Sequence, residues 1–410
     1  MLNQDQKLAN IINLGREISE IIDVDVLLDR TLQIARDLTN ADAGSIYIKE
    51  SDKLKFYHTQ NDTLQKRLPP GKKLIYSIFS IPINSRSIAG CCASTGDILN
   101  IPDVHRLPRD ASYSFDSKFD ELSHYHTRSM LALPLKNQWK DIIGILQLIN
   151  AQDDARNITV FSTEDESLIM HFANLSAGAL ERAQLTRALI LRMIKMAELR
   201  DPMETAPHVN RVAAYTVEIY EAWARKRGIS RDEVQKNKDI LRMAAMLHDV
   251  GKMAVSDLIL QKPARLTDEE REVMQQHTFL GARLFADPYS NFDEAAFKVT
   301  LNHHERWDGN GYPGHINPLT GEPIQGYETK NGKARGKKGE EIHHYGRLVA
   351  IADVYDALSS NRVYKEAWKE DQVFDTLMED AGKQFDPEMI EAFFDSIDVI
   401  RNIAERYSDR

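Results

Sequence analysis

Residues 303–314 read His-His-Glu-Arg-Trp-Asp-Gly-Asn-Gly-Tyr-Pro-Gly. Histidine and acidic side chains are seldom fully buried unless something binds them, so the start of this stretch is poor core material. Its glycines allow backbone angles that other residues resist, and the chain can therefore turn tightly after the histidines. His248-Asp249 lies upstream and Asp353 lies downstream. Together these residues predict a cage for metal ions in the C-terminal half of the chain.

The composition is that of a globular protein with more than one domain. The chain has 410 residues, of which 42% are hydrophobic and 28% are charged. Its apolar runs are much shorter than a membrane span, and its polar N-terminus lacks a signal-peptide pattern. We therefore expect a cytoplasmic protein with no membrane partner.

Charge and cysteine usage narrow the class further. The net charge of −10 argues against a broad nucleic-acid surface, although it is compatible with a small phosphate ligand held by metal ions. The two cysteines, Cys91 and Cys92, are neighbours, so no disulfide framework is expected and a reducing compartment fits.

The N-terminal half predicts an α+β domain with an antiparallel sheet and flanking helices. Apolar residues at helical spacing predict helix over residues 1 to about 40, and small residues predict a short helix over 87–95. Strand patterns occur at residues 45–48, 54–57, 129–135 and 142–150, and the polar residues 136–140 are typical of a hairpin connection.

This half resembles a GAF domain, a small-molecule sensor module. The resemblance is carried by residues 99–103 (Leu-Asn-Ile-Pro-Asp), 129–135 and 143–150. It implies an N-terminal helix and a GAF domain over residues 1–183. Residues 115–121 are similar to an acidic motif of cyclic-nucleotide-binding members, which implies ligand contacts by Lys118, Asp120 and Glu121. The alternative is that these three side chains form a solvated charged surface.

A long helix is predicted over residues 163–200. Thr163 and Glu166 have the spacing of a capping box, and apolar residues recur at helical spacing for more than 30 residues beyond them. Such a helix is unusual inside one compact domain, so we expect it to join two domains and to pair with a second copy in a homodimer. The alternative is a helix that lies against its own two domains.

Beyond residue 200, residues of the metal-ligand type appear in a series. Glu204 and His208 are four residues apart, which suits one helical face, although Pro207 makes a turn leading into the helix equally compatible. A helix over residues 238–248 is predicted to end at His248-Asp249, with Gly251 as its stop signal.

The later members of the series lie on further predicted helices. Thr267 and Glu270 predict the capped start of a helix that carries His277, and a helix from about residue 293 leads to His303 and His304. Asp353 lies in an apolar run, where an unpaired carboxylate would be costly. Any one of these residues is ordinary alone, but the whole set indicates a metal centre: Glu204, His208, His248, Asp249, His277, His303, His304 and Asp353. Mixed imidazole and carboxylate donors suit iron or manganese, and zinc is the alternative.

The C-terminal half resembles the HD-domain phosphohydrolases. Residues 303–313 match the signature of the HD-GYP branch, His-His-Glu-x-x-Asp-Gly-x-Gly-Tyr-Pro, at every defined position. The resemblance implies an all-α domain over residues 201–410. It also implies a phosphodiesterase that converts the bacterial messenger cyclic di-GMP into linear pGpG and then GMP.

The same resemblance implies roles for individual residues. One metal ion would be held by His208, His248, Asp249 and Asp353, a second by Asp249, His277 and His303, and a third with the help of Glu204 and His304. Asp249 and Lys252 would be catalytic. The implied substrate contacts are Lys252, Asp308, Gly311, Tyr312, Arg362 and Lys365. Val363 stands where relatives often have proline, a minor departure.

The insertion of residues 315–345 is a larger departure, because relatives have only a short link there. Asn331-Gly332 predicts a small β-hairpin, and the insertion is rich in lysine and arginine. The basic side chains would attract an anionic substrate, or the segment is a solvated flexible insertion. Three alternatives for the whole chain stay open: a cyclic-dinucleotide receptor without turnover, a protein whose GAF half is the principal functional unit, and a phosphodiesterase specific for cyclic GMP-AMP.

Overall fold

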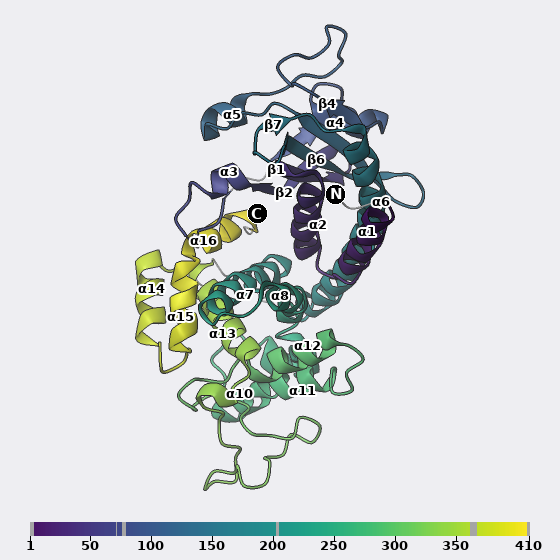
Figure 1. Cartoon of the computed structure of the whole chain (residues 1–410). Helices are drawn as coiled ribbons and strands as arrows, with labels where there is room; N and C mark the ends of the chain where they lie inside the picture. The colour runs from purple at the N-terminus through teal and green to yellow at the C-terminus, as the bar shows by residue number, and fades with distance from the viewer. Residues whose placement is uncertain (1–3, 71, 76–78, 202–204, 361–366, 408–410) are drawn as a thin grey trace. The chain divides into compact units, whose positions relative to one another are not determined.

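The computed structural model describes residues 4–70, 72–75, 79–201, 205–360 and 367–407, and of residues 4–11 only the backbone. The chain forms two compact units, residues 1–187 and 188–410. Each is described by itself (Figure 1). Among the described residues, we find no helix that combines the length and the apolar character needed to cross a membrane.

The first unit is an α+β domain, as predicted. Its helices and strands are α1 (Gln4–Ser19), α2 (Val24–Thr39), β1 (Ala41–Glu50), β2 (Lys53–Asn61), α3 (Asp62–Gln65), β3 (Ser80–Pro82), α4 (Ile88–Thr95), β4 (Leu99–Ile101), α5 (Lys118–Ser123), β5 (Met130–Lys136), β6 (Ile142–Gln152) and β7 (Ile158–Thr159). The strands are antiparallel in the order β3-β2-β1-β6-β5-β4, and β7 pairs with β6.

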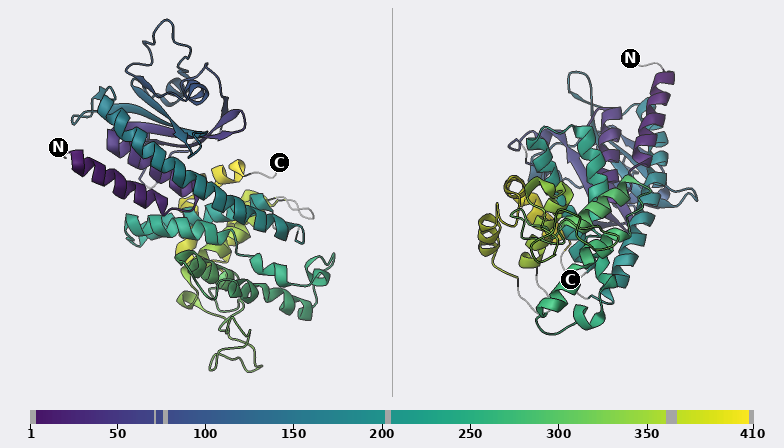
Figure 2. Two further views of the ribbon diagram at one scale, coloured as in Figure 1. Left: turned by 90° about the vertical axis from the view of Figure 1, so that its right-hand side faces the viewer. Right: turned by 90° about the horizontal axis from the view of Figure 1, so that it is seen from below.

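Alternation along the central strands builds two apolar layers, one on each face of the sheet. In β5, Leu131 and Leu133 face the layer built with α2 and the long helix α6 (Thr163–Glu198), whereas Met130 and Ala132 face α4. Gly15 of α1 lies against Leu175 of α6, and the two helices run side by side (Figure 2).

The predicted long helix is present as α6, but its apolar residues divide into two sets. Ile169, Phe172 and Ile190 are buried, whereas Leu175 and Met193, which the sequence places in the same stripe, are exposed. The helix begins at Thr163, as predicted, but Ser162 and Asp165 cap it in place of the expected pair, Thr163 and Glu166.

The second unit is helical, as predicted. Its elements are α7 (Ala206–Lys226), α8 (Arg231–Ala245), the 3-10 helix η1 (Val250–Ala254), α9 (Asp257–Leu260), α10 (Asp268–Gln275), α11 (His277–Arg283), α12 (Asn291–Asn302), the 3-10 helix η2 (Gly339–Glu341), α13 (His344–Ser359), α14 (Glu370–Glu379), α15 (Pro387–Asp395) and α16 (Ile397–Arg406). α7 packs against α8, α13, α15 and α16, and its Tyr215 and Tyr220 are fully buried.

Two helix boundaries near the metal-ligand-type residues differ from the prediction. α8 ends at Ala245, so His248 lies beyond the helix, and Gly251 lies within η1 and does not stop α8. The helix that Thr267 begins ends at Gln275, and His277 is the first residue of a new helix. In both places turn residues interrupt the regular α-helix just before the ligand-type side chain.

The insertion of residues 315–345 contains two isolated antiparallel bridges, one between Ile316 and Pro323 and one between Glu328 and Ala334. Its tip is a three-residue loop closed by a hydrogen bond from Thr329 N to Lys333 O, and Gly332 has a positive φ of 74°. This is the common hairpin loop with glycine in the left-handed region, so the predicted hairpin is reduced to its turn. Ile316 and Ala334 pack against α11 and α12, so the segment has a core contact of its own.

Candidate metal centre

Seven of the predicted ligands form two adjacent groups. Asp249, His277, His303 and His304 form one group, and His208, His248 and Asp353 form the other. Within each group the potential ligand atoms lie within 4.8 Å of one another. They come from α7, the segment after α8, α11, the end of α12 and α13, elements that are far apart in the sequence.

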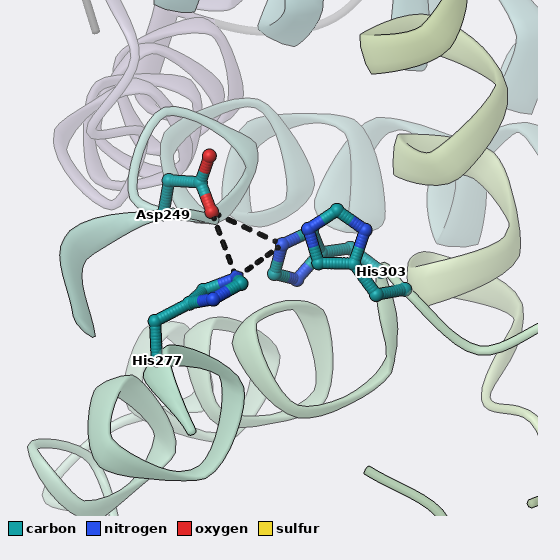
Figure 3. Close-up of side chains that lie close together, drawn as sticks. Asp249, His277 and His303 are labelled. Atoms are coloured by element: carbon teal, nitrogen blue, oxygen red, sulfur yellow. Dashed lines mark hydrogen bonds and ion pairs between the residues drawn. The ribbon is translucent and has the colours of Figure 1, made fainter. Parts of the chain in front are cut away.

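Asp249 lies between the two groups. Its Oδ1 atom is 3.0 Å from His277 Nε2 and 3.3 Å from His303 Nε2 (Figure 3). Its Oδ2 atom is 3.5 Å from His248 Nε2 and 2.7 Å from Lys252 Nζ. Each oxygen of this carboxylate therefore faces a different set of donors, which is the arrangement that a carboxylate bridging two cations needs.

In three of these histidines, the contact made by Nδ1 determines that Nε2 is the nitrogen available to a metal ion. The Nδ1 atoms of His248 and His277 lie 2.9 and 2.7 Å from the carbonyl oxygens of Ala245 and Met274. His303 Nδ1 lies 3.0 Å from Thr300 O. A carbonyl oxygen can only accept, so Nδ1 carries the proton and Nε2 keeps its lone pair.

The pKa shifts of Asp249 and His304 also suit a metal site. Burial works to raise the pKa of Asp249, but Lys252 and the nearby histidines hold that pKa well below its ordinary value. Burial, together with His303 and His277, holds the pKa of His304 well below its ordinary value, so this imidazole is neutral. An ionised carboxylate beside a neutral imidazole is a typical combination of donors in a metal site.

One buried atom tests whether a cation fits. His248 Nε2 is fully buried and has no hydrogen-bond partner among the described residues, although carboxylate oxygens lie 3.5 and 3.9 Å away. A buried polar atom without a partner is costly, and a cation among these donors would remove that cost. The residues present therefore fit a metal centre.

The turn at residues 309–314 lies beside the first group. The ring of Tyr312 stacks on the ring of His304, with centroids 4.8 Å apart. A Cβ at Gly311 would overlap the backbone of Glu305 and Arg306, so only glycine permits this close approach. The carboxylate of Asp308 binds Arg306 at 3.0 Å and the backbone N–H of Asn310, contacts that shape the turn itself.

Glu305 connects the turn to the insertion. Its carboxylate accepts hydrogen bonds from Gly314 N at 2.6 Å and Lys337 N at 3.1 Å, and burial raises its pKa to about 7. Lys337 Nζ donates to Asn302 Oδ1 at 2.7 Å. Other basic groups of the insertion form ion pairs with the protein's own acids, Lys333 with Glu272 and Arg335 with Glu341.

Other predicted site residues fall elsewhere or cannot be placed. Glu204, Arg362 and Lys365 lie outside the described residues. Lys118, Asp120 and Glu121 lie on the short helix α5. Asp120 accepts hydrogen bonds from Thr127 N and Oγ1, and Glu121 accepts one from Ser117 Oγ, so both carboxylates are engaged by their own loop.

Two residues behind the site were not predicted from the sequence. Asp356 binds His208 Nδ1, and Arg211 binds Asp356. Asp356 lies three residues after Asp353, and Arg211 lies three residues after His208. Residues at this spacing share a helical face, so a search for charged residues one turn from each ligand would have found them.

Comparison with known families assigns both halves of the chain. A GAF domain model matches residues 23–180, and an HD domain model matches residues 205–358. A cyclic di-GMP phosphodiesterase of Vibrio cholerae is 32% identical over 274 residues, which are 64% of this chain and 51% of the relative. A cyclic di-GMP phosphodiesterase of Thermotoga maritima is 35% identical over 221 residues, 54% of this chain and 52% of the relative.

A third relative is named for a different substrate. The 3'3'-cGAMP-specific phosphodiesterase 2 of Vibrio cholerae is 32% identical over 215 residues, which are 52% of this chain and 35% of the relative. The chain thus spans about half, or less, of the length of these three curated relatives.

Proposed function

Since the chain consists of a GAF domain followed by an HD domain, we propose that it is a metal-dependent phosphodiesterase that hydrolyses cyclic di-GMP. The observation that carries the proposal is the pair of ligand groups joined by Asp249. The names of the Vibrio and Thermotoga relatives support the substrate.

We propose that His208, His248, Asp353 and Asp249 hold one ion and that Asp249, His277, His303 and His304 hold another. Iron or manganese suits these mixed nitrogen and oxygen donors, with zinc as the alternative. Ions held there would neutralise charge on the phosphoryl oxygens and lower the pKa of water to about 7. The resemblance implied that Glu204 and His304 help to hold a third ion. His304 lies with Asp249, His277 and His303, and the third ion stays a prediction.

The chain's own residues would bind and orient the substrate. Lys252 Nζ lies beside Asp249, where an ammonium group would stabilise negative charge on a phosphoryl oxygen. The face of Tyr312, stacked over His304, is placed to contact a base or ribose. Arg362 and Lys365 are proposed to hold the second phosphate. Hydrolysis of one of the two phosphodiester bonds gives linear pGpG, and a second hydrolysis gives GMP.

The second candidate substrate is cyclic GMP-AMP, which the third relative's name supports. It has the same two phosphodiester bonds and differs in one base. The two substrates are distinguished by comparing kcat/KM for each on the same preparation. A higher value for cyclic GMP-AMP would replace cyclic di-GMP as the proposed substrate.

The proposal is tested by removing both central ligands. His248→Ala combined with Asp249→Ala is expected to abolish turnover of cyclic di-GMP, because it takes donors from both ligand groups. Product formation by anaerobically purified protein with added ferrous or manganous ions is measured by chromatography.

The matched control replaces His171 and Asp154 with alanine, since both side chains are exposed and lie in the other unit. It is expected to turn over at the wild-type rate. Normal turnover by the His248/Asp249 variant would refute the site. If the wild-type protein binds cyclic di-GMP without cleaving it, the protein is a cyclic-dinucleotide receptor and not a phosphodiesterase.

We also propose that a small ligand of the GAF domain regulates hydrolysis and that two copies pair along α6. Leu185, Leu189, Met193 and Met196 support the pairing, because they are at least half exposed and recur every three or four residues. Such a stripe is typical of a helix that packs against a partner helix.

A further inference from the structure

A buried carboxylate lies directly behind His208. Asp356 Oδ2 is 2.8 Å from His208 Nδ1, and both side chains are at most 5% exposed. Asp356 is on α13, one helical turn beyond Asp353, whose Oδ1 is 3.7 Å from the other nitrogen of His208. The imidazole therefore lies between two carboxylates from the same helix, one at each nitrogen.

Arg211 holds Asp356 in place. Its Nε atom donates to Asp356 Oδ1 at 2.6 Å, and its Nη2 atom donates to Asp356 Oδ2 at 3.0 Å. The remaining amino group donates to the backbone oxygen of Tyr407 at 2.8 Å. The planar guanidinium thus contacts both oxygens of the carboxylate, which prevents Asp356 from rotating away from His208.

His208 differs here from three other histidines of the centre. His248, His277 and His303 donate from Nδ1 to backbone carbonyl oxygens, whereas His208 donates to an ionised side chain. A carboxylate behind an imidazole fixes its tautomer and orientation and makes the free nitrogen a stronger donor.

We propose that Asp356, held by Arg211, is a positioning residue that keeps His208 Nε2 directed at a cation. This inference rests on the proposed metal centre but not on the identity of the substrate. It adds three residues to that centre: Arg211 in the second turn of α7, Asp356 in α13, and Tyr407 after α16, whose backbone oxygen accepts a hydrogen bond from Arg211.

The test is the affinity of the protein for Mn²⁺, measured by isothermal titration calorimetry on the chelator-treated, full-length protein. Asp356→Asn keeps the shape of the side chain but removes its charge, and its amide can donate to Nδ1 and select the wrong tautomer. We expect Mn²⁺ to bind about 10–100-fold more weakly at one site. Raising the Mn²⁺ concentration should restore full occupancy.

The matched control is Asp386→Asn. Asp386 is also buried and also paired with an arginine, Arg347, at 2.6 Å, but it has no hydrogen bond or ion pair with a histidine in the part of the chain that the structure describes. This variant should lose thermal stability while binding Mn²⁺ with wild-type affinity. A role limited to burying an ion pair predicts the same behaviour for both variants.

The outcomes separate this inference from the proposed function. A folded Asp356→Asn protein with wild-type Mn²⁺ affinity would overturn the inference and leave the phosphodiesterase proposal intact. If that variant does not fold, Arg211→Lys decides, because lysine cannot reproduce the two-pronged contact, and wild-type affinity there would overturn it. A wild-type protein that binds no Mn²⁺ would overturn both.

Discussion

Single residues in the C-terminal domain are positioned by groups that lie behind them. Backbone carbonyl oxygens orient three imidazoles of the metal centre, and Asp356 orients a fourth. A second pair of histidines, His343 and His344, is held by ring stacking. His343 and His344 stack on each other with centroids 4.3 Å apart, and His344 stacks on Trp223.

This pair should make the domain sensitive to acid. Burial, with neighbouring positive charge, lowers the pKa of His343 to about 3 and that of His344 to about 4, from 6.5. Between these values and 6.5 the unfolded chain binds more protons than the folded chain. The contribution to stability is therefore fully present above about pH 6.5 and is lost as pH falls.

We expect His343→Asn combined with His344→Phe to reduce this loss. Asparagine can still accept the hydrogen bond from Tyr345 N, and phenylalanine can still stack on Trp223. Urea unfolding of chelator-treated protein at pH 7.5 and pH 5.0 measures the effect. The wild-type protein should lose more stability than the variant between the two pH values, and equal losses would contradict the assignment.

Between elements, a close approach of two backbones brings Asp249 to His277. η1 packs against α11, and a Cβ at Gly251 would overlap the backbone oxygen of His277 and the backbone of Gly281. Gly251 is thus needed for the packing of η1 against α11 and not for ending α8. Local signals did predict the capping box of Thr267 and Glu270, which involves only four consecutive residues.

Gly251→Ala is therefore expected to destabilise the C-terminal domain by about 1–3 kcal/mol and to weaken Mn²⁺ binding. Gly228→Ala is the matched control. No described residue lies within 4 Å of a Cβ at Gly228, but its φ is +70°, so alanine there should cost about 1 kcal/mol through backbone strain alone. Urea unfolding and metal titration of both variants measure the difference, and a Gly251→Ala protein with wild-type metal affinity would contradict this role.

At the scale of the whole molecule, α6 continues from the first unit into the second. The unit boundary falls at residues 187 and 188, inside this helix. A second copy paired along α6 would cover its exposed leucine and methionine side chains. The proposed dimer thus places the contact between copies on the helix that the two units share.

Leu189→Glu combined with Met193→Glu is expected to convert the protein to monomers, because it places charge on the apolar stripe of both helices. Light scattering should give about twice the chain mass of 46.8 kDa for the wild-type protein and the single mass for the variant. Lys195→Glu, an exposed change about 115° around the helix from the centre of the stripe, should leave the mass unchanged. A monomeric wild-type protein would refute the pairing.

The sequence by itself determined the two domain classes, the long helix and the residue types of the metal centre. These properties depend on apolar periodicity and on short motifs, which act between residues close in the chain. The division of the α6 stripe into a buried and an exposed set was not predictable, because it depends on which residues meet α1, α2 and the sheet.

Only the tertiary structure decided how the donors meet. His208 and Asp353 are 145 positions apart in the sequence, yet Nε2 and Oδ1 lie 3.7 Å apart. The two oxygens of Asp249 face different ligand groups, and Asp356 stands behind His208. Such distances depend on the packing of helices through glycine contacts and buried ion pairs, which spacing along the chain does not specify.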